Sequence, residues 1–184
     1  ALHAAPIKPD DASALLVSDV QNCFLPGGSL AVKDGEQVVP VINRIAKSFA
    51  NVVMTQDWHT SGHVSFASSH AGKKPFETVD LAYGKQVLWP DHCVQGSKGA
   101  EFHAQLDRTR IAKVFHKGVD PDIDSYSGLF DNGHRRGTGL AEFRKSNGVT
   151  DVYIAGLATD DCVKYTALDA RPPGHNVYAH DAGA

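Results

Sequence analysis

Cys162 is the residue whose surroundings best suit nucleophilic chemistry. It lies in GLATDDCVKYTALDA (156–170), between an apolar run and a stretch of helical character. Thr159 or Asp160 is suited to cap that helix, which would place Cys162 in its first turn. Backbone N–H groups and the helix dipole favour an anion there, so we expect a lowered thiol pKa and a reactive sulfur. A small buried residue that packs the helix is an equally weighted alternative.

Two other residues could activate and orient such a nucleophile. Asp19 follows the apolar run LLVS, and Lys117 follows KVFH. We expect Asp19 to accept the thiol proton and later return it to a leaving amine, while Lys117 holds the thiolate and orients the pair. Taken singly, each has a plainer interpretation. Asp19 is more often a cap or turn residue, and a lysine at a strand end usually reaches into solvent.

A second group of residues has the chemistry of metal ligands. Asp57, His59 and His63 lie in DWHTSGH, and His92 lies in WPDHC. In an extended segment residues 57 and 59 point to the same side, so one cation can contact both. A carboxylate with two imidazoles and open positions suits zinc, iron or manganese. The chain has 10 histidines, so chance clustering in a solvated loop is the alternative.

Short apolar runs alternate with helical spacings along the chain. Strands are expected over 14–19, 51–57, 110–117, 149–157 and 175–181. Helices are expected over 36–50, 99–106, 138–148 and 160–170. Residues 58–98 are rich in Gly, Pro, His and Ser, and we expect a long functional loop there.

This alternation predicts a Rossmann-like α/β fold with three layers, in which helices cover both faces of a mainly parallel sheet. Ligands bind beyond the carboxyl ends of the strands in such sheets. The polar residues that follow the predicted strands should therefore meet at one rim. These residues are Asp19, Asp57, His59, Lys117 and Cys162.

Composition excludes several classes of function. The chain of 184 residues suits one domain over 1–184, with 42% hydrophobic and 21% charged residues and a net charge of −3. No basic cluster indicates nucleic-acid binding, no run is long enough to cross a membrane, and the N-terminal stretch does not resemble a signal peptide. The 3 cysteines are far apart, so we expect no disulfide scaffold and a cytoplasmic location.

Five blocks of the sequence together resemble one family. They are LLVSDVQNCFLPGGSLAV, TQDWHTSGHVSFASSH, LWPDHCVQGSKGAEFH, VFHKGVDPDIDSYSGLFDN and VYIAGLATDDCVKYTALDA. In this order they resemble the bacterial nicotinamidases (pyrazinamidases) of the isochorismatase-like cysteine hydrolases. The resemblance implies an isochorismatase-like fold and hydrolysis of nicotinamide to nicotinate and ammonia in NAD salvage, with pyrazinamide commonly accepted as well.

The resemblance also implies roles for individual residues. The family triad of Asp, Lys and Cys falls on Asp19, Lys117 and Cys162. The oxyanion hole would be formed by the backbone N–H groups of Ala158 and Cys162, with a non-proline cis peptide just before Ala158.

The implied cofactor is one divalent metal ion, with zinc preferred over iron or manganese. Its ligands would be Asp57, His59 and His92, and His63 ranks below these three as a fourth ligand. The aromatic walls of the substrate pocket would be Phe24, Trp89 and Tyr126.

The sequence departs from the family pattern in three places. Cys23 stands in DVQNCF where the family usually has an acid, and we expect altered hydrogen bonds around the site. ALDARPPGHNV carries two prolines at a helix end. The chain stops at HDAGA where relatives continue, so we expect an incomplete C-terminal end.

Other functions stay open at this point. The same fold and triad could serve another small amide or a carbamoyl compound, and an inactive scaffold that binds a metal or a partner is a third option. We expect a small-molecule substrate and no nucleic-acid or membrane partner. The sequence leaves the oligomeric state undetermined, with a homo-oligomer as one option.

Overall fold

The central feature of the computed structural model is a parallel sheet. The model describes residues 8–157, 159–171 and 176–180, and within them five strands pair in the order β5-β2-β1-β6-β7. All four pairings are parallel. The strands are β1 (Ser13–Ser18), β2 (Asn51–Asp57), β5 (Ile111–Lys117), β6 (Asp151–Gly156) and β7 (Asn176–His180).

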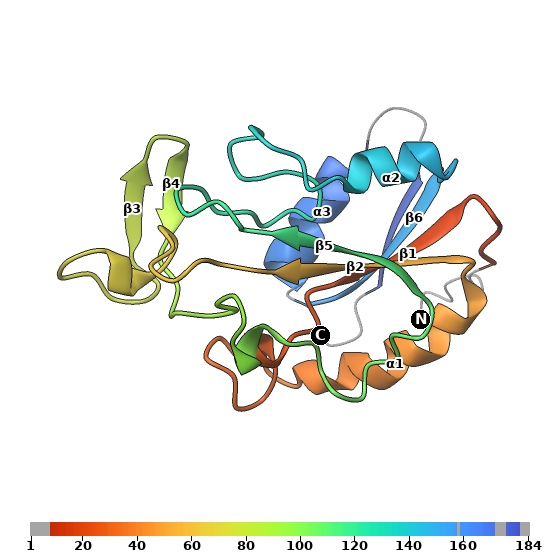
Figure 1. The fold of residues 1–184 in the computed structure, drawn as a ribbon, viewed down its shortest axis with the longest axis horizontal. Helices are drawn as coiled ribbons and strands as arrows, with labels where there is room; N and C mark the ends of the chain where they lie inside the picture. Colours follow the sequence, from red (N-terminus) through yellow and green to blue (C-terminus); the bar gives the residue numbers. More distant parts are fainter. Residues whose placement is uncertain (1–7, 158, 172–175, 181–184) are drawn as a thin grey trace, which may run out of the picture.

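Helices cover both faces of this sheet (Figure 1). Helix α1 (Val38–Ile45) lies on one face, and α2 (Leu140–Ser146) and α3 (Lys164–Asp169) lie on the other. The predicted three-layer α/β/α fold is thereby confirmed.

Strand β1 contributes to the hydrophobic cores on both faces, because successive side chains of a strand point to opposite sides. Leu15 and Val17 join the cluster that includes Ile42 of α1. Leu16 joins the cluster that includes Leu140 of α2. A strand buried on both faces is mostly apolar along its length, which explains why ALLV in the middle of β1 has no polar alternation.

Most predicted elements exist, although several begin or end at different residues. The predicted strand over 51–57 coincides with β2. The predicted helix over 36–50 is one α-helix flanked by 3₁₀ turns at Gly35–Gln37 and Ala46–Ser48.

The predicted helix over 99–106 is wrong. Only a 3₁₀ turn forms there, at Lys98–Ala100, with the hydroxyl of Ser97 accepting the Ala100 N–H. The backbone that follows bonds to another loop instead of to itself. The Glu101 carbonyl accepts the Asn22 N–H, and the His103 N–H donates to Val20.

The long segment 58–98 contains a hairpin that we did not predict. Strands β3 (Thr78–Leu81) and β4 (Gly84–Val87) pair antiparallel and lie beyond the ends of β2 and β5 (Figure 1). Most of their side chains are at least partly exposed, and the polar–apolar alternation of TVDL is too short to stand out in the sequence. The exception is Gln86 of β4, which is fully buried.

A disulfide joins Cys23 to Cys93, where we expected none. The two residues are 70 positions apart, and their Cα atoms lie 5.6 Å from one another. Cys23 belongs to the loop after β1, and Cys93 belongs to the loop that also carries His92. Their proximity depends on how two loops pack, which cysteine spacing alone does not reveal.

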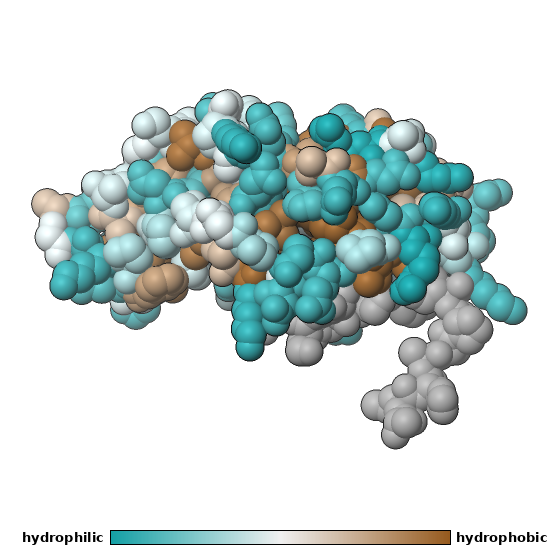
Figure 2. Space-filling model, turned by 90° about the horizontal axis from the view of Figure 1, so that it is seen from below, coloured by the Kyte–Doolittle hydropathy of each residue, from teal (hydrophilic) through white to brown (hydrophobic). Residues whose placement is uncertain are grey.

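The surface in Figure 2 is mainly hydrophilic, with hydrophobic residues in separate patches. Within the described parts of the chain, no helix combines the length and apolar character that a membrane span requires.

The order of the strands determines where a site can form. The chain runs from β1 outward to β2 and β5, then returns to the other side of β1 with β6 and β7. The connections therefore diverge between β1 and β6. In sheets of this kind the ligand-binding crevice lies at that switch point, beyond the carboxyl ends of the strands.

Candidate active site

Lys117, the last residue of β5, lies at the centre of the rim. Its Nζ atom is 3.1 Å from Asp19 Oδ2, 3.2 Å from Asp57 Oδ1 and 3.4 Å from Cys162 Sγ. It also donates to the Ser125 carbonyl at 3.1 Å. Lys117 is 2% exposed, so it does not reach solvent as a strand-end lysine ordinarily does. Burial disfavours its charge, but the carboxylates of Asp19 and Asp57 more than offset this and raise its pKa well above the usual value.

Residues of strands β1 and β2 fix the position of Asp19. It directly follows β1, and its backbone has a left-handed φ of 50°. Thr55 of β2 donates its hydroxyl to Asp19 Oδ1 at 2.8 Å, and Ser18 donates to Oδ2 at 3.3 Å. Burial raises the pKa of Asp19, and the charge of Lys117 opposes this only in part. The result is a fixed carboxylate with an increased affinity for a proton.

Cys162 lies in a π-helical turn, Thr159–Val163, that precedes α3. The predicted helix over 160–170 is therefore present with Cys162 in its first turn, and that turn is π-helical instead of α-helical. Burial raises the pKa of the Cys162 thiol well above its usual value, and Lys117 opposes this only in part. Our expectation of a lowered thiol pKa is not supported, because desolvation and nearby carboxylates outweigh a short helix. The thiol therefore keeps its proton until a base removes it.

Asp57, His59 and His92 form a second cluster beside the first. Their ligand atoms all lie within 4.8 Å of one another. Nε2 of His59 is 3.0 Å from Asp57 Oδ2, and Nε2 of His92 is 3.4 Å from the same oxygen. The Nδ1 atoms bond at 2.9 and 2.8 Å to the carbonyls of Gly118 and Pro90, respectively. Since a carbonyl only accepts, each Nδ1 carries a proton, so in the neutral ring each Nε2 offers its lone pair to a cation.

The charge and hydrogen bonding of this cluster fit a divalent metal. Asp57 Oδ1 and His59 Nε2 are buried, and neither has a well-directed hydrogen-bond partner among the described residues. Burial raises the pKa of Asp57, but the charges of His59 and Lys117 outweigh it and hold the pKa well below the usual value. Burial lowers the pKa of His59, and the Asp57 charge reverses this to give a net increase. An ionised carboxylate beside imidazole nitrogens suits zinc, iron or manganese.

His63 is differently placed. Its Nδ1 lies 2.8 Å from the Ser65 hydroxyl and its Nε2 lies 2.8 Å from the Asp120 carbonyl. Its ligand atom also groups with those of His59 and Asp124. Burial lowers its pKa, which favours the neutral ring. Because both nitrogens already have partners, His63 remains below the other three as a predicted ligand.

A pocket of about 190 Å³ opens onto Cys162, Lys117, Asp57 and His92. Trp89 and Tyr126 meet edge to face across 6.3 Å between ring centroids. The ring centroids of Phe24 and His92 are 5.6 Å apart. These three aromatic residues, predicted as the walls, all line the pocket.

Sequence reasoning did not identify several residues of this pocket. Gln86 donates to Asp124 Oδ2 at 2.9 Å and to the Tyr126 hydroxyl at 3.1 Å. Asp124 and Asp161 both line the pocket, and Thr55 holds Asp19. The polar run DSYS (124–127) was a usable signal. Nothing about Gln86 in the sequence marked it as buried.

The predicted oxyanion hole falls partly outside the described residues. Ala158 and the peptide bond before it lie in the undescribed position between β6 and the π-helical turn. Their predicted role is therefore unchanged by the structure.

Comparison with known proteins gives consistent results. A family model described as the isochorismatase domain matches residues 13–182. A nicotinamidase of Acinetobacter baylyi is 49% identical over 172 residues, which are 94% of this chain and 80% of that protein. A nicotinamidase-pyrazinamidase structure from Acinetobacter baumannii superposes with a TM-score of 0.90 and 48% identity, covering 95% of this chain and 87% of the other.

Two further solved structures contain small ligands. One from L. infantum, in complex with nicotinate, has a TM-score of 0.81 and 40% identity over 94% of this chain and 81% of its own. A pyrazinamidase from Pyrococcus horikoshii, in complex with zinc, has a TM-score of 0.70 and 36% identity over 91% of this chain and 83% of its own. With the family match over nearly the whole described chain, these findings show that the chain belongs to the isochorismatase family.

Proposed function

We propose that this chain hydrolyses nicotinamide to nicotinate and ammonia, with Cys162 as nucleophile and a divalent metal in the site. The observation that supports it most is the contact of one buried ammonium, Lys117 Nζ, with a thiol and two carboxylates. This arrangement places a nucleophile and a base within 3.4 Å of one fixed positive charge, Lys117 Nζ. Relatives that carry the name nicotinamidase support the same substrate.

The pocket suits one small planar ring. Its volume of about 190 Å³ is below the range typical of pockets for drug-sized ligands. Phe24, Trp89 and Tyr126 provide aromatic contacts, and the lining also includes Cys162 and two residues of the metal cluster, Asp57 and His92. A pyridine carboxamide has a flat ring, a ring nitrogen and an amide carbon, which correspond to these three features. Pyrazinamide has the same shape, and we propose it as a second substrate.

The proposed chemistry uses the raised pKa values of Asp19 and Cys162. Asp19 removes the thiol proton as the sulfur attacks the amide carbon, and Lys117 stabilises the developing negative charge on sulfur. The C–N bond breaks, and the proton on Asp19 goes to the departing ammonia. A water molecule then gives its proton to Asp19 and attacks the thioester carbon. The C–S bond then breaks, Asp19 returns this proton to the Cys162 sulfur to regenerate the thiol, and nicotinate leaves.

The metal would be held by Asp57, His59 and His92. A divalent ion bound there would supply a Lewis acid that binds the ring nitrogen and so orients the carboxamide. Asp57 would contribute the negative charge, and the fixed Nδ1–H bonds of the histidines would direct their Nε2 atoms into the site.

Ammonia release from nicotinamide tests the proposed reaction. We expect release by the wild type and none above background by Cys162→Ala, because the thioester then cannot form. Release from other small amides but not from nicotinamide would transfer the proposal to a different substrate. Full activity of Cys162→Ala would exclude the covalent route.

A second variant tests the proposed role of the metal. His92→Ala should lower metal content and raise KM for nicotinamide, while the Cys162 thiol still reacts with a small alkylating agent. His103→Ala is the matched control, since His103 is partly exposed and does not line this pocket. Normal nicotinamide binding by His92→Ala would contradict the role assigned to the metal.

A further inference from the structure

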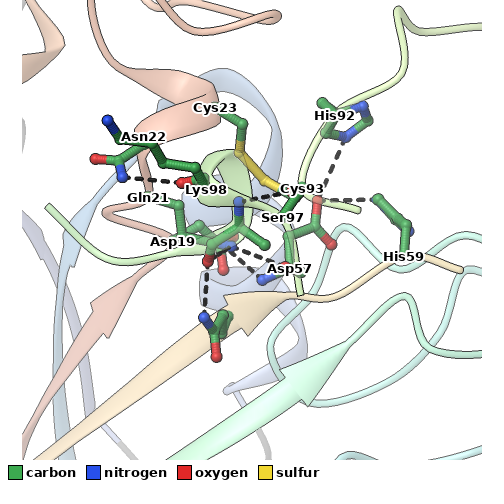
Figure 3. Close-up of a disulfide and its surroundings, with 12 residues drawn as sticks. Asp19, Gln21, Asn22, Cys23, Asp57, His59, His92, Cys93, Ser97 and Lys98 are labelled. Atoms are coloured by element: carbon green, nitrogen blue, oxygen red, sulfur yellow. Dashed lines mark hydrogen bonds and ion pairs between the residues drawn. A yellow bond between two sulfur atoms is a disulfide. The ribbon is translucent and has the colours of Figure 1, made fainter. Parts of the chain in front are cut away.

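The Cys23–Cys93 disulfide connects the two loops that form one side of the pocket (Figure 3). Cys23 directly precedes Phe24, an aromatic wall of the pocket, and Cys93 directly follows His92, a proposed metal ligand. Both cysteines are 1% exposed. The bond is therefore adjacent in sequence to a substrate contact at one end and a metal ligand at the other.

Cys93 also contacts a second proposed ligand. Its carbonyl accepts the backbone N–H of His59 at 3.1 Å, and the His59 carbonyl accepts the N–H of Gln95 at 2.8 Å. The position of Cys93 thus influences His92 through the chain and His59 through a hydrogen bond. The backbone of Cys93 has a φ of 45°, a left-handed conformation that residues with a β-carbon seldom adopt. Such a conformation persists where surrounding restraints enforce it, and the disulfide is one of them.

The Cys23 end of the link is anchored separately. Asn22 donates its backbone N–H to the Glu101 carbonyl at 2.9 Å and its side-chain amide to the Lys98 carbonyl at 2.9 Å. The Cys23 carbonyl accepts the Leu30 N–H at 3.0 Å. These bonds do not depend on the disulfide. When the link opens, these bonds still limit the movement of the Cys23 loop.

We propose that the Cys23–Cys93 disulfide is a positioning element for the metal-binding loop, and that its reduction by a dithiol loosens both metal and substrate. This inference rests on the proposed function, because that function identifies the loop around His92 as metal-binding. Two separate sulfur atoms need more room than two bonded ones, so two thiols in this buried space displace the loops. Because Cys93 adjoins His92, the displacement alters the metal ligand set.

The reduction is a two-electron exchange. A thiolate of the dithiol attacks Cys23 Sγ, the Cys23–Cys93 bond breaks, and Cys93 leaves as a thiolate that takes a proton. The second thiol of the reagent then displaces Cys23, which also takes a proton. Two protein thiols and one cyclic disulfide of the reagent result.

Cys23 borders a surface hollow from which a reagent could approach the bond. A cavity of about 710 Å³ is lined by Cys23 together with Gly28, Lys98 and Gly99. It is distinct from the pocket that Cys162 lines. A reagent that approaches Cys23 from this hollow would not pass through the active site.

Thiol counting tests the bond itself. Protein purified in air without reductant should take up one alkyl group per chain in denaturant, on Cys162, and three after treatment with dithiothreitol. Three alkyl groups before reduction would overturn the proposal.

Metal retention tests the positioning role. Zinc-loaded wild type is reduced with dithiothreitol, desalted under nitrogen and challenged with a chromophoric chelator at 25 °C. We expect release of zinc from the folded, reduced protein to be faster by about tenfold or more, the usual scale for losing support around a metal ligand. A disulfide with a merely structural role would lower the unfolding temperature without changing this rate, and an unchanged rate would overturn the proposal.

Two variants serve as controls. Cys162→Ala should show the same redox-dependent zinc release, because it keeps the disulfide and lacks only the nucleophile. Cys23→Ala/Cys93→Ala should release zinc at one rate with and without dithiothreitol, and a dithiothreitol effect in it would overturn the proposal. If this double variant does not fold, the comparison of oxidised and reduced wild type still decides.

Kinetics separate this inference from the proposed function. Reduction should raise KM for nicotinamide more than it lowers kcat at saturating zinc. Redox-dependent zinc release without nicotinamide hydrolysis would support the disulfide inference and refute the proposed function. Hydrolysis of nicotinamide, combined with a zinc-release rate and a KM that do not change on reduction, would support the proposed function and refute the disulfide inference.

Discussion

The two sides of the pocket are built in different ways. On one side, Asp19 directly follows β1, Lys117 is the last residue of β5, and the Cys162 turn comes shortly after β6. On the other side His92, Trp89 and the disulfide belong to loops that no sheet holds. The first side is positioned by strand register, and the second by hydrogen bonds and a covalent link between loops.

This difference determines how each side tolerates change. Asp57 and Lys117 are register partners in neighbouring strands, so the sheet itself brings carboxylate and ammonium together. His59 and His92 depend on single carbonyl acceptors, at Gly118 and Pro90. Changes on the strand side should therefore act on charge and chemistry. Changes on the loop side should act on metal and substrate binding.

The largest effect should come from Lys117→Met. Two buried carboxylates, Asp19 and Asp57, would then lack their shared positive charge. We expect hydrolysis to fall by about 10³-fold or more and the free energy of unfolding to fall by about 3–5 kcal/mol. Steady-state kinetics and urea unfolding measure both.

Asp19→Asn is the matched comparison for Lys117→Met. It should be equally inactive but lose much less stability, because Lys117 keeps Asp57 as a partner and burial already disfavours the Asp19 charge. The stability deficit of Lys117→Met should also shrink as pH falls, since its carboxylates then bind protons. Equal destabilisation by both variants at neutral pH would contradict this view of the charge network.

The next largest effect should come from the loop side, with Gly118→Ala. A β-carbon at Gly118 would overlap the His59 ring, and the φ of +62° adds strain. We expect zinc affinity to fall by about 10–100-fold while alkylation of the Cys162 thiol persists. Gly62→Ala is the control, because Gly62 has a φ of +73° but no atom within 4 Å of the added carbon. Similar loss of zinc in both variants would mean that backbone strain, and not the His59 contact, is responsible.

A smaller effect concerns the reactivity of the strand-side thiol. Burial raises the pKa of Cys162, so the thiolate fraction at pH 8 should be below that of a free cysteine. In metal-free oxidised protein, iodoacetamide should label Cys162 at least about tenfold more slowly than a peptide thiol at pH 8. The rate should still be rising at pH 10. A labelling rate that levels off near neutral pH would show that the thiol pKa is lowered after all. Cys162→Ala is the control and should show no labelling.

The comparison also explains what the sequence could predict. Apolar runs place strands, and parallel strands bring their carboxyl ends together, so the meeting of Asp19, Lys117 and Cys162 followed from pattern alone. The π-helical turn and the raised thiol pKa did not follow, because both depend on how the turn packs. The hairpin was missed because its strands are only four residues long and mostly exposed, and the Cys23–Cys93 link was missed because it depends on how two loops pack.

The smallest effect should come from the hairpin, which reaches the pocket through Gln86. This fully buried amide donates to Asp124 Oδ2 at 2.9 Å and to the Tyr126 hydroxyl at 3.1 Å. Gln86→Leu removes both donors and leaves a buried carboxylate short of a partner, which costs about 1–3 kcal/mol of stability. We expect KM for nicotinamide to rise by about 3–10-fold with kcat and zinc content unchanged, since only binding of the ring is affected.

Lys85→Ala on the same hairpin provides the control for Gln86→Leu. It breaks the Lys85–Asp80 ion pair, whose side chains are 77% and 81% exposed, and such pairs contribute little. If Lys85→Ala raised KM as much as Gln86→Leu, the whole hairpin would be acting on the pocket through its general stability. If only Gln86→Leu did so, one buried amide would connect an otherwise exposed hairpin to substrate binding. The loop side would then depend on single contacts where the strand side depends on register.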